Sequence, residues 1–122
     1  MKPEQAGAYA PICRRHRPPS SADLSTITAI ATSGLRAADA AMRASAHNLA
    51  NLQTEGFRRE RVVDTAQADG GVMASTVRAQ EQGSSIHEDL VAQLQARNAF
   101  LANLAVFRAG SRAAGSLLDV YA

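Results

Sequence analysis

The sequence predicts a mainly α fold, in which long N- and C-terminal helices pair as a coiled-coil-like hairpin, with a short β-hairpin or extended loop between them. Three observations predict this fold. Apolar and small residues recur every seven positions across residues 24–52. A second helical apolar pattern runs over residues 86–121. The segment between the two patterns carries β-type residues on both sides of a glycine turn.

The first 19 residues differ from the rest of the chain. They mix Gly, Pro, Ala and Arg without a period and end in Pro18-Pro19, so we expect residues 1–19 to form a disordered arm before a single domain of residues 20–122. Residues 1–20 hold four basic residues and one acidic residue, a charge of +3, which leaves −1 for the remainder of a chain with net charge +2. We expect this arm to be solvated; an attachment point for an acidic partner is the alternative.

The first helix is predicted over residues 24–52, directly after the candidate N-cap oxygens of Ser20, Ser21 and Asp23. Gly34 inside this helix costs about 1 kcal/mol relative to alanine, which close contact with another helix would explain. Two series of positions seven residues apart, offset by four, predict a coiled-coil-like seam rich in small side chains. The first series is Leu24, Ala31, Ala38, Ser45 and Leu52, and the second is Thr28, Leu35, Met42 and Leu49.

The middle of the chain predicts a change of structure. Gly56 is suited to end the first helix or the turn after it, because glycine adopts positive φ without a Cβ clash. Residues 57–80 predict a short β-hairpin or an extended loop around a turn at Asp69-Gly70-Gly71. We expect this segment to project from one end of the helical hairpin.

The second helix is predicted over residues 86–121, with Ser85 and Glu88 spaced as a capping box at its start. Its apolar residues cover more than one face. A lone helical hairpin buries only one stripe on each helix, so the surplus predicts contact with helices of other chains.

The composition argues against several classes of function. Cys13 is the single cysteine, and the three histidines are too far apart in sequence to suggest a metal site. No run approaches the ~20 apolar residues of a membrane span, and the N-terminus lacks the apolar core of a cleaved signal peptide. No phosphate-binding glycine loop or nucleophile–base pattern is present. We therefore expect no enzymatic activity, no cofactor and no small-molecule substrate.

Two segments near the end of the first helix carry a resemblance. Ser33-Gly34-Leu35-Arg36-Ala37 and a segment from His47 to Arg59 resemble the N-terminal signature of bacterial flagellar rod and hook proteins, approximately S-G-L-x-A followed by N-[IL]-A-N-x-x-T-x-G-[FY]-[KR]-R. The chain departs from this pattern at His47, Leu52 and Glu55. The matching positions are Asn48, Leu49, Ala50, Asn51, Thr54, Gly56, Phe57, Arg58 and Arg59.

The C-terminal half carries a second resemblance to the same family. Glu88-Asp89-Leu90-Val91 and the segment from Gln95 to Asn103 are similar to E-E-M-V and Q-A-x-x-A-[YF]-x-A-N, and residues 115–120 resemble the G-T-L-L-D-I ending. Arg112 and Ala113 depart from the usual Glu and Met. The segment between the two signatures is short, which suits a short rod-type member of the family.

The resemblance implies a structural subunit of the flagellar basal-body rod. Members of this family pair their terminal helices as a coiled coil and stack helically with copies of themselves and with other rod and axial proteins. They pass unfolded through the flagellar type III export apparatus without signal cleavage and support motility. The alternative is a dimeric helical-hairpin module that binds nucleic acid through Arg14–Arg17; salt-dependent DNA binding would distinguish the two.

The polar residues of the signature have local interpretations as well. Asn48 and Asn51 are three positions apart on one helical face, where they can reach a neighbouring subunit or bind free carbonyls and cap the helix. Arg58, Arg59 and Arg61 can pair with acidic groups of another subunit or form a solvated face.

The apolar surface of the second helix is the predicted assembly interface. Phe100 and Phe107 are seven residues apart, on one face with Leu104, and we place them near its centre. The alternative is that both rings pack only against the first helix of the same chain. Leu117 and Leu118 complete the predicted interface.

We expect deletion of residues 1–19 to leave the helical content of the domain unchanged, because these residues show no period and end in Pro-Pro. Circular dichroism of the full and the shortened chain measures this. Loss of most of the helix signal would show that the arm is structural.

Overall fold

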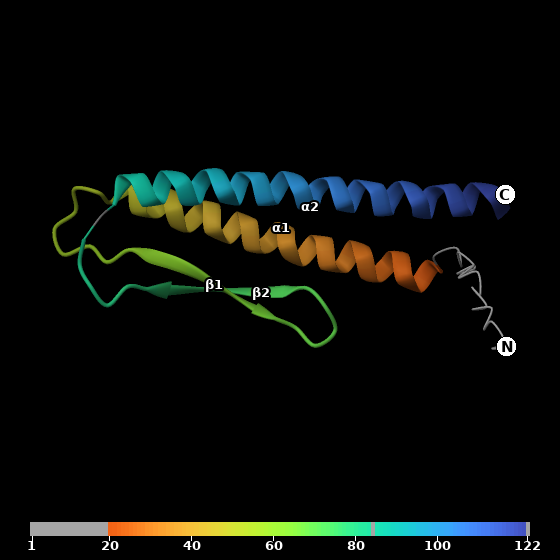
Figure 1. Cartoon of the computed structure of the whole chain (residues 1–122), viewed down its shortest axis with the longest axis horizontal. Coiled ribbons are helices and arrows are strands. Elements are labelled where there is room, and N and C mark those ends of the chain that lie inside the picture. The colour runs from red at the N-terminus through yellow and green to blue at the C-terminus, as the bar shows by residue number, and fades with distance from the viewer. Residues whose placement is uncertain (1–19, 84, 122) are drawn as a thin grey trace, which may run out of the picture.

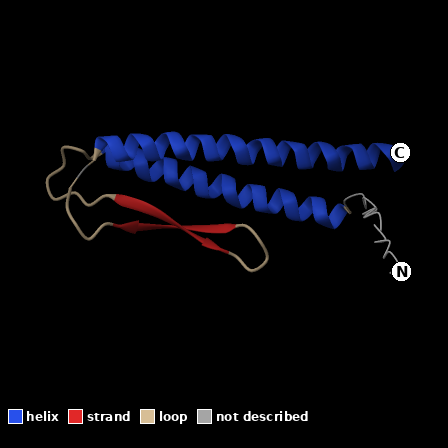
Figure 2. Ribbon diagram, viewed as in Figure 1, coloured by secondary structure: helices blue, strands red, loops and turns tan. Residues whose placement is uncertain are grey.

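The structure, a computed structural model, describes residues 20–83 and 85–121, so the predicted arm lies outside the described residues. Two long antiparallel helices, α1 (Ser21–Ala50) and α2 (Ile86–Tyr121), lie side by side. Strands β1 (Glu60–Ala66) and β2 (Val72–Arg78) form an antiparallel two-stranded sheet between them in sequence. The predicted fold class, two paired long helices with a β-hairpin between them, is confirmed (Figures 1 and 2).

Helix α1 begins with a reciprocal cap. Ser20 is the N-cap: its hydroxyl accepts a hydrogen bond from the Asp23 amide, and the Asp23 carboxylate accepts from the Ser20 amide and hydroxyl. These bonds from Ser20 lower the pKa of Asp23. The predicted cap residues Ser20 and Asp23 are therefore confirmed, although the helix begins at Ser21 and not at Leu24, and ends at Ala50 and not at Leu52.

The seam predicted from the seven-residue spacing is the face of α1 that packs on α2. Leu24, Ala31, Ala38 and Ser45 of the first series are buried, and all four residues of the second series are half-buried. Both series lie on this face because positions seven apart return to the same side of a supercoiled helix. Gly34 is explained by the same contact. A Cβ at Gly34 would lie 2.4 Å from the side-chain oxygen of Asn103 on α2. The cost of glycine is thus offset by a close helix approach.

Helix α2 continues the seam with its own small residues. Ala96 is buried, and at Gly110 a Cβ would meet the methyl group of Thr28 at 3.0 Å. At the start of α2, the Glu88 carboxylate binds Arg59 from the loop before β1.

The β-hairpin does not project from the end of the helices as predicted. It folds back and lies along α1 (Figure 1). Val62 and Val72 face the alanine side of α1, where Ala37 and Ala44 are buried. The Val72 amide donates to the Ser33 hydroxyl at 3.1 Å and holds the tip of the hairpin against the helix. A two-stranded hairpin is marginal alone, and packing on a helix stabilises it.

The turn of the hairpin confirms the predicted glycine turn. Ala66 pairs with Val72, so five residues connect the strands. Gly70 and Gly71 have φ values of 90° and 87°, in the region that favours glycine. A side chain at Gly71 would also meet Ser33, its Cβ lying 2.5 Å from the hydroxyl oxygen. The turn therefore requires glycine for its backbone and for its contact with α1.

Enlarging a buried seam alanine should destabilise the helix pair. Ala31 is 1% exposed, so Ala31→Leu is expected to cost about 1–3 kcal/mol of unfolding free energy through overpacking. Urea unfolding followed by circular dichroism measures this. The matched control is Ala46→Leu at an exposed position of the same helix, expected within about 0.5 kcal/mol of wild type. Equal effects of the two substitutions would contradict the seam.

Candidate functional site

A buried polar network joins the N-terminal signature to the start of α2. Its centre is Asn48, which lies in the last turn of α1 and is 2% exposed. The Asn48 amide nitrogen donates to the carbonyl of Glu60 and to the carboxylate of Asp89, both at 2.9 Å. Its side-chain oxygen accepts from the Glu60 amide at 2.8 Å. One side chain thereby ties α1 to β1 and to α2.

Arg59 completes the network from the loop before β1. Its guanidinium binds the Asp89 carboxylate at 2.7 Å and also the carboxylate of Glu88. The bonds from Asp89 and Glu88 raise the pKa of Arg59, so the guanidinium stays charged. Asp89 is 1% exposed and its charge is compensated by Arg59 and Asn48, which is the condition for burying a carboxylate. Asp89 Oδ2 and Arg59 Nε have no hydrogen-bond partner among the described residues.

Asn51 caps the C-terminal end of α1, which is one of the two roles expected for it from the sequence. It is the C-cap of α1, and its amide nitrogen donates to the carbonyl of His47 at 2.8 Å. The Thr54 hydroxyl donates to the Asn51 side-chain oxygen at 3.2 Å and closes the turn. Gly56 follows with φ 72°, which explains the glycine of the signature. The signature thus encodes a helix end and a reversal of the chain.

The remaining signature residues support this turn. The Phe57 ring packs on the ring of His47 with centroids 5.5 Å apart, and the Gly83 amide donates to the Phe57 carbonyl. Leu49 is half-buried and Ala50 is exposed. Arg58 is exposed and joins Gly83 through its backbone. Among the residues that the structure describes, Arg59 alone of the three predicted arginines is bound to carboxylates.

The predicted interface residues of α2 occupy two environments. Phe100 and Phe107 are half-buried and lie at helical spacing from Ala96, Asn103 and Gly110, on the side of α2 that packs on α1. Intrachain packing is therefore at least part of their role, and their place in an assembly interface stays a prediction. Leu104 and Leu117 are half-buried as well, whereas Leu118 is 75% exposed.

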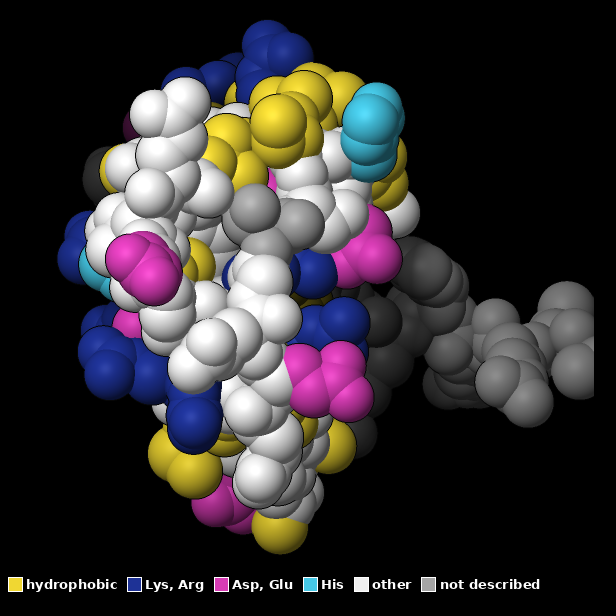
Figure 3. All heavy atoms as spheres, turned by 90° about the vertical axis from the view of Figure 1, so that its left-hand side faces the viewer, with side chains coloured by type: hydrophobic (Ala, Val, Ile, Leu, Met, Phe, Trp, Pro, Cys, Tyr) yellow, Lys and Arg dark blue, Asp and Glu magenta, His cyan; other side chains and the backbone are white. Residues whose placement is uncertain are grey.

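Two apolar surfaces are more exposed than the predicted interface around Phe100, Leu104 and Phe107. Leu90, Leu94 and Leu101 form one row on a flank of α2, which we call the leucine row, and are 45%, 58% and 50% exposed. Val63, Met73 and Val77 are exposed on the outer face of the β-hairpin. In the end-on view, apolar side chains lie at the top, over α2, and at the bottom, over the hairpin (Figure 3). The spacing of four and then seven residues in the leucine row was visible in the sequence, but the exposure of the row depended on which stripe of α2 faces α1.

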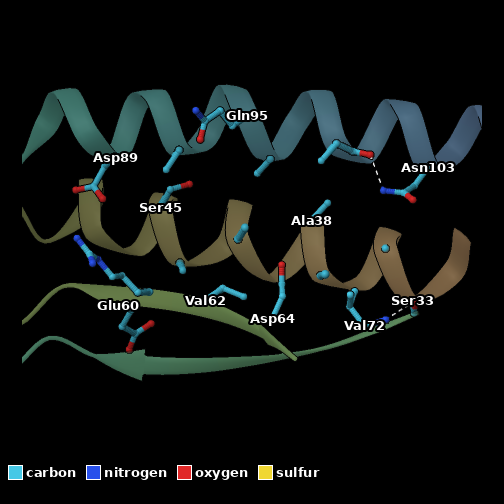
Figure 4. A pocket seen from close by; sticks show the side chains of 18 of the residues that line it. Ser33, Ala38, Ser45, Glu60, Val62, Asp64, Val72, Asp89, Gln95 and Asn103 are labelled. Carbon is cyan, nitrogen blue, oxygen red and sulfur yellow. Dashed lines mark hydrogen bonds between the residues drawn. The ribbon is translucent and has the colours of Figure 1, made fainter. Parts of the chain in front are cut away.

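A groove runs between α2 and the β-hairpin over the alanine side of α1, and its volume is about 640 Å³ (Figure 4). Its floor is formed by small residues of α1, including Gly34, Ala37 and Ala41. Ala92 and Ala99 of α2 line one wall and Val62 of β1 lines the other. The polar network of Asn48, Arg59 and Asp89 lines one end.

Within residues 20–83 and 85–121, no helix is long and apolar enough to cross a membrane, and no group of three metal-binding side chains comes together. No known family model and no curated protein matches the chain at a significant level. The resemblance to flagellar rod and hook proteins therefore depends on the quoted residues.

Removing the amide of Asn48 should destabilise the fold strongly for a single side chain. Asn48→Ala leaves the N–H and the carbonyl of Glu60 without their side-chain partner, at about 1–3 kcal/mol for each unsatisfied group, and leaves the Asp89 carboxylate with Arg59 alone. The urea midpoint, followed by circular dichroism, measures the change. Asn98→Ala, at an exposed position of α2, is the control and should leave the midpoint nearly unchanged. A midpoint equal to that of the control would show that the network contributes no stability.

Proposed function

We propose that this protein is a short structural subunit of the bacterial flagellar basal-body rod. It assembles through its helices with copies of itself and with other rod and axial proteins, is exported without a cleaved signal peptide, and supports motility. It acts by packing and catalyses nothing. This proposal extends the resemblance of both signatures to the rod and hook family.

The observation that carries the proposal is the contact between the two signatures. Asn48 and Arg59 belong to the N-terminal signature and Asp89 to the C-terminal one, 41 residues after Asn48, and they meet in one buried network. If the two signatures belong to one structural unit, residues of one signature are expected to bond to residues of the other in the fold. Chance similarity of two separate segments gives no reason for such a contact.

The distribution of apolar residues also supports a structural role. In residues 20–83 and 85–121, the buried hydrophobic residues are one leucine and five alanines, whereas larger apolar side chains of α2 and of the hairpin are exposed. Exposed apolar area of this kind is typical of a surface that binds another protein. The alternative, nucleic-acid binding through Arg14–Arg17, depends on residues outside the described ranges.

The experiment is a deletion of the gene in its own bacterium, complemented with a tagged copy. Cells without the protein should fail to swim in soft agar, and the tagged protein should be found in purified basal bodies. Complementation with Asn48→Ala should restore motility less well than Asn98→Ala at equal expression. Normal swimming of the deletion strain together with absence of the protein from basal bodies would overturn the proposed function.

A further inference from the structure

The groove and the leucine row lie on opposite flanks of the same helix. Ala92, Ala99 and Asn103 of α2 line the groove. Leu90, Leu94 and Leu101 are close to half a turn away, because each residue advances the helix by about 100°. A molecule therefore presents a row of large side chains on one side and a groove with a floor of small side chains on the other.

The two surfaces are similar in length. The α2 wall of the groove runs from Glu88 to Asn103, about 22 Å at 1.5 Å per residue. The leucine row spans about 16 Å from Leu90 to Leu101 on the same scale. Large side chains on one surface can insert between the small side chains of the other, as knobs insert into the holes of a facing helix.

The charges of the two surfaces are complementary. Four carboxylates and two guanidinium groups line the groove. Asp64 points into it midway between Asp89 and Asn103, and it has no partner among the residues that the structure describes (Figure 4). On the other flank, Arg97 lies within the leucine row between Leu94 and Leu101; it is exposed and likewise unpaired in the described part of the chain.

We propose that the leucine row of one copy packs into the groove of the next copy, with Arg97 paired to Asp64 of that copy. This inference rests on the proposed function, because it names the surfaces through which copies of the chain assemble. Side-by-side copies with little axial shift place Arg97 opposite Asp64, since both lie near the middle of their surfaces. Each copy keeps its own groove open for a further copy, so the contact is heterologous and builds a ring or a helix.

Charge reversal tests the pairing in the full-length purified chain. Arg97→Glu and Asp64→Arg should each weaken self-association by ~10-fold or more, because each places like charges opposite one another. The double variant should return to within ~3-fold of wild type. Arg36→Glu, at an exposed arginine of α1 outside both surfaces, is the matched control. Sedimentation velocity over a concentration series measures association, and circular dichroism checks that the helices are intact.

Cross-linking tests the direction of the contact. In a Cys13→Ser background, a chain with both Leu94→Cys and Ala99→Cys should form dimers, trimers and higher species with a short bismaleimide. Either cysteine alone should form few cross-links, since a head-to-tail contact does not place identical residues together. Efficient dimers from Leu94→Cys alone would overturn the inference in favour of a symmetric contact.

Three further results would overturn the inference: a monomeric chain at all soluble concentrations, a double charge variant that associates as weakly as the single variants, or an Arg97→Glu chain that associates normally.

Failure of the proposed function can be distinguished from failure of this packing. A chain that passes the charge and cross-linking tests but is absent from basal bodies would keep the packing and lose the rod assignment. A chain found in basal bodies that fails these tests would lose only the packing.

Discussion

The hydrogen bonds of Asn48 are the interaction on which the rest of the structure depends. The side-chain amide of Asn48 accepts one hydrogen bond and donates two. Two of these three bonds satisfy the N–H and the carbonyl of Glu60 at the start of β1. Because the same amide also binds Asp89, it fixes where the hairpin leaves α1 and where α2 begins. The buried Asp89 needs a compensating cation, and Arg59 reaches it only when the chain has reversed after α1.

The second constraint is the size of the side chains in the seam. Alanine and glycine let α1 and α2 approach closely, as the contact between Gly34 and Asn103 shows. Small side chains bury little area, and burial is worth only about 25 cal/mol for each Å². The seam therefore contributes little hydrophobic stabilisation to the single chain. The same small residues leave the groove between α2 and the hairpin open.

Much of the fold was predictable because it depends on local spacing. The seven-residue series identified the buried side of α1, and Gly70 and Gly71 identified the turn. The network was not predictable in the same way. Asn48 and Asp89 are 41 positions apart, and neither type of residue indicates its partner in sequence. The fold-back of the hairpin and the pairing of Glu88 with Arg59 also depend on contacts between distant segments.

The site on α2 shows why a list of apolar residues does not define an interface. Phe100 and Phe107 are the large side chains that the sequence makes conspicuous, yet they lie on the side of α2 that packs on α1. The leucine row occupies the next stripe of the helix and remains exposed. In a helix with apolar residues on more than one face, the stripe that the partner helix leaves uncovered is available for other chains, and the small residues of the seam decide which stripe that is.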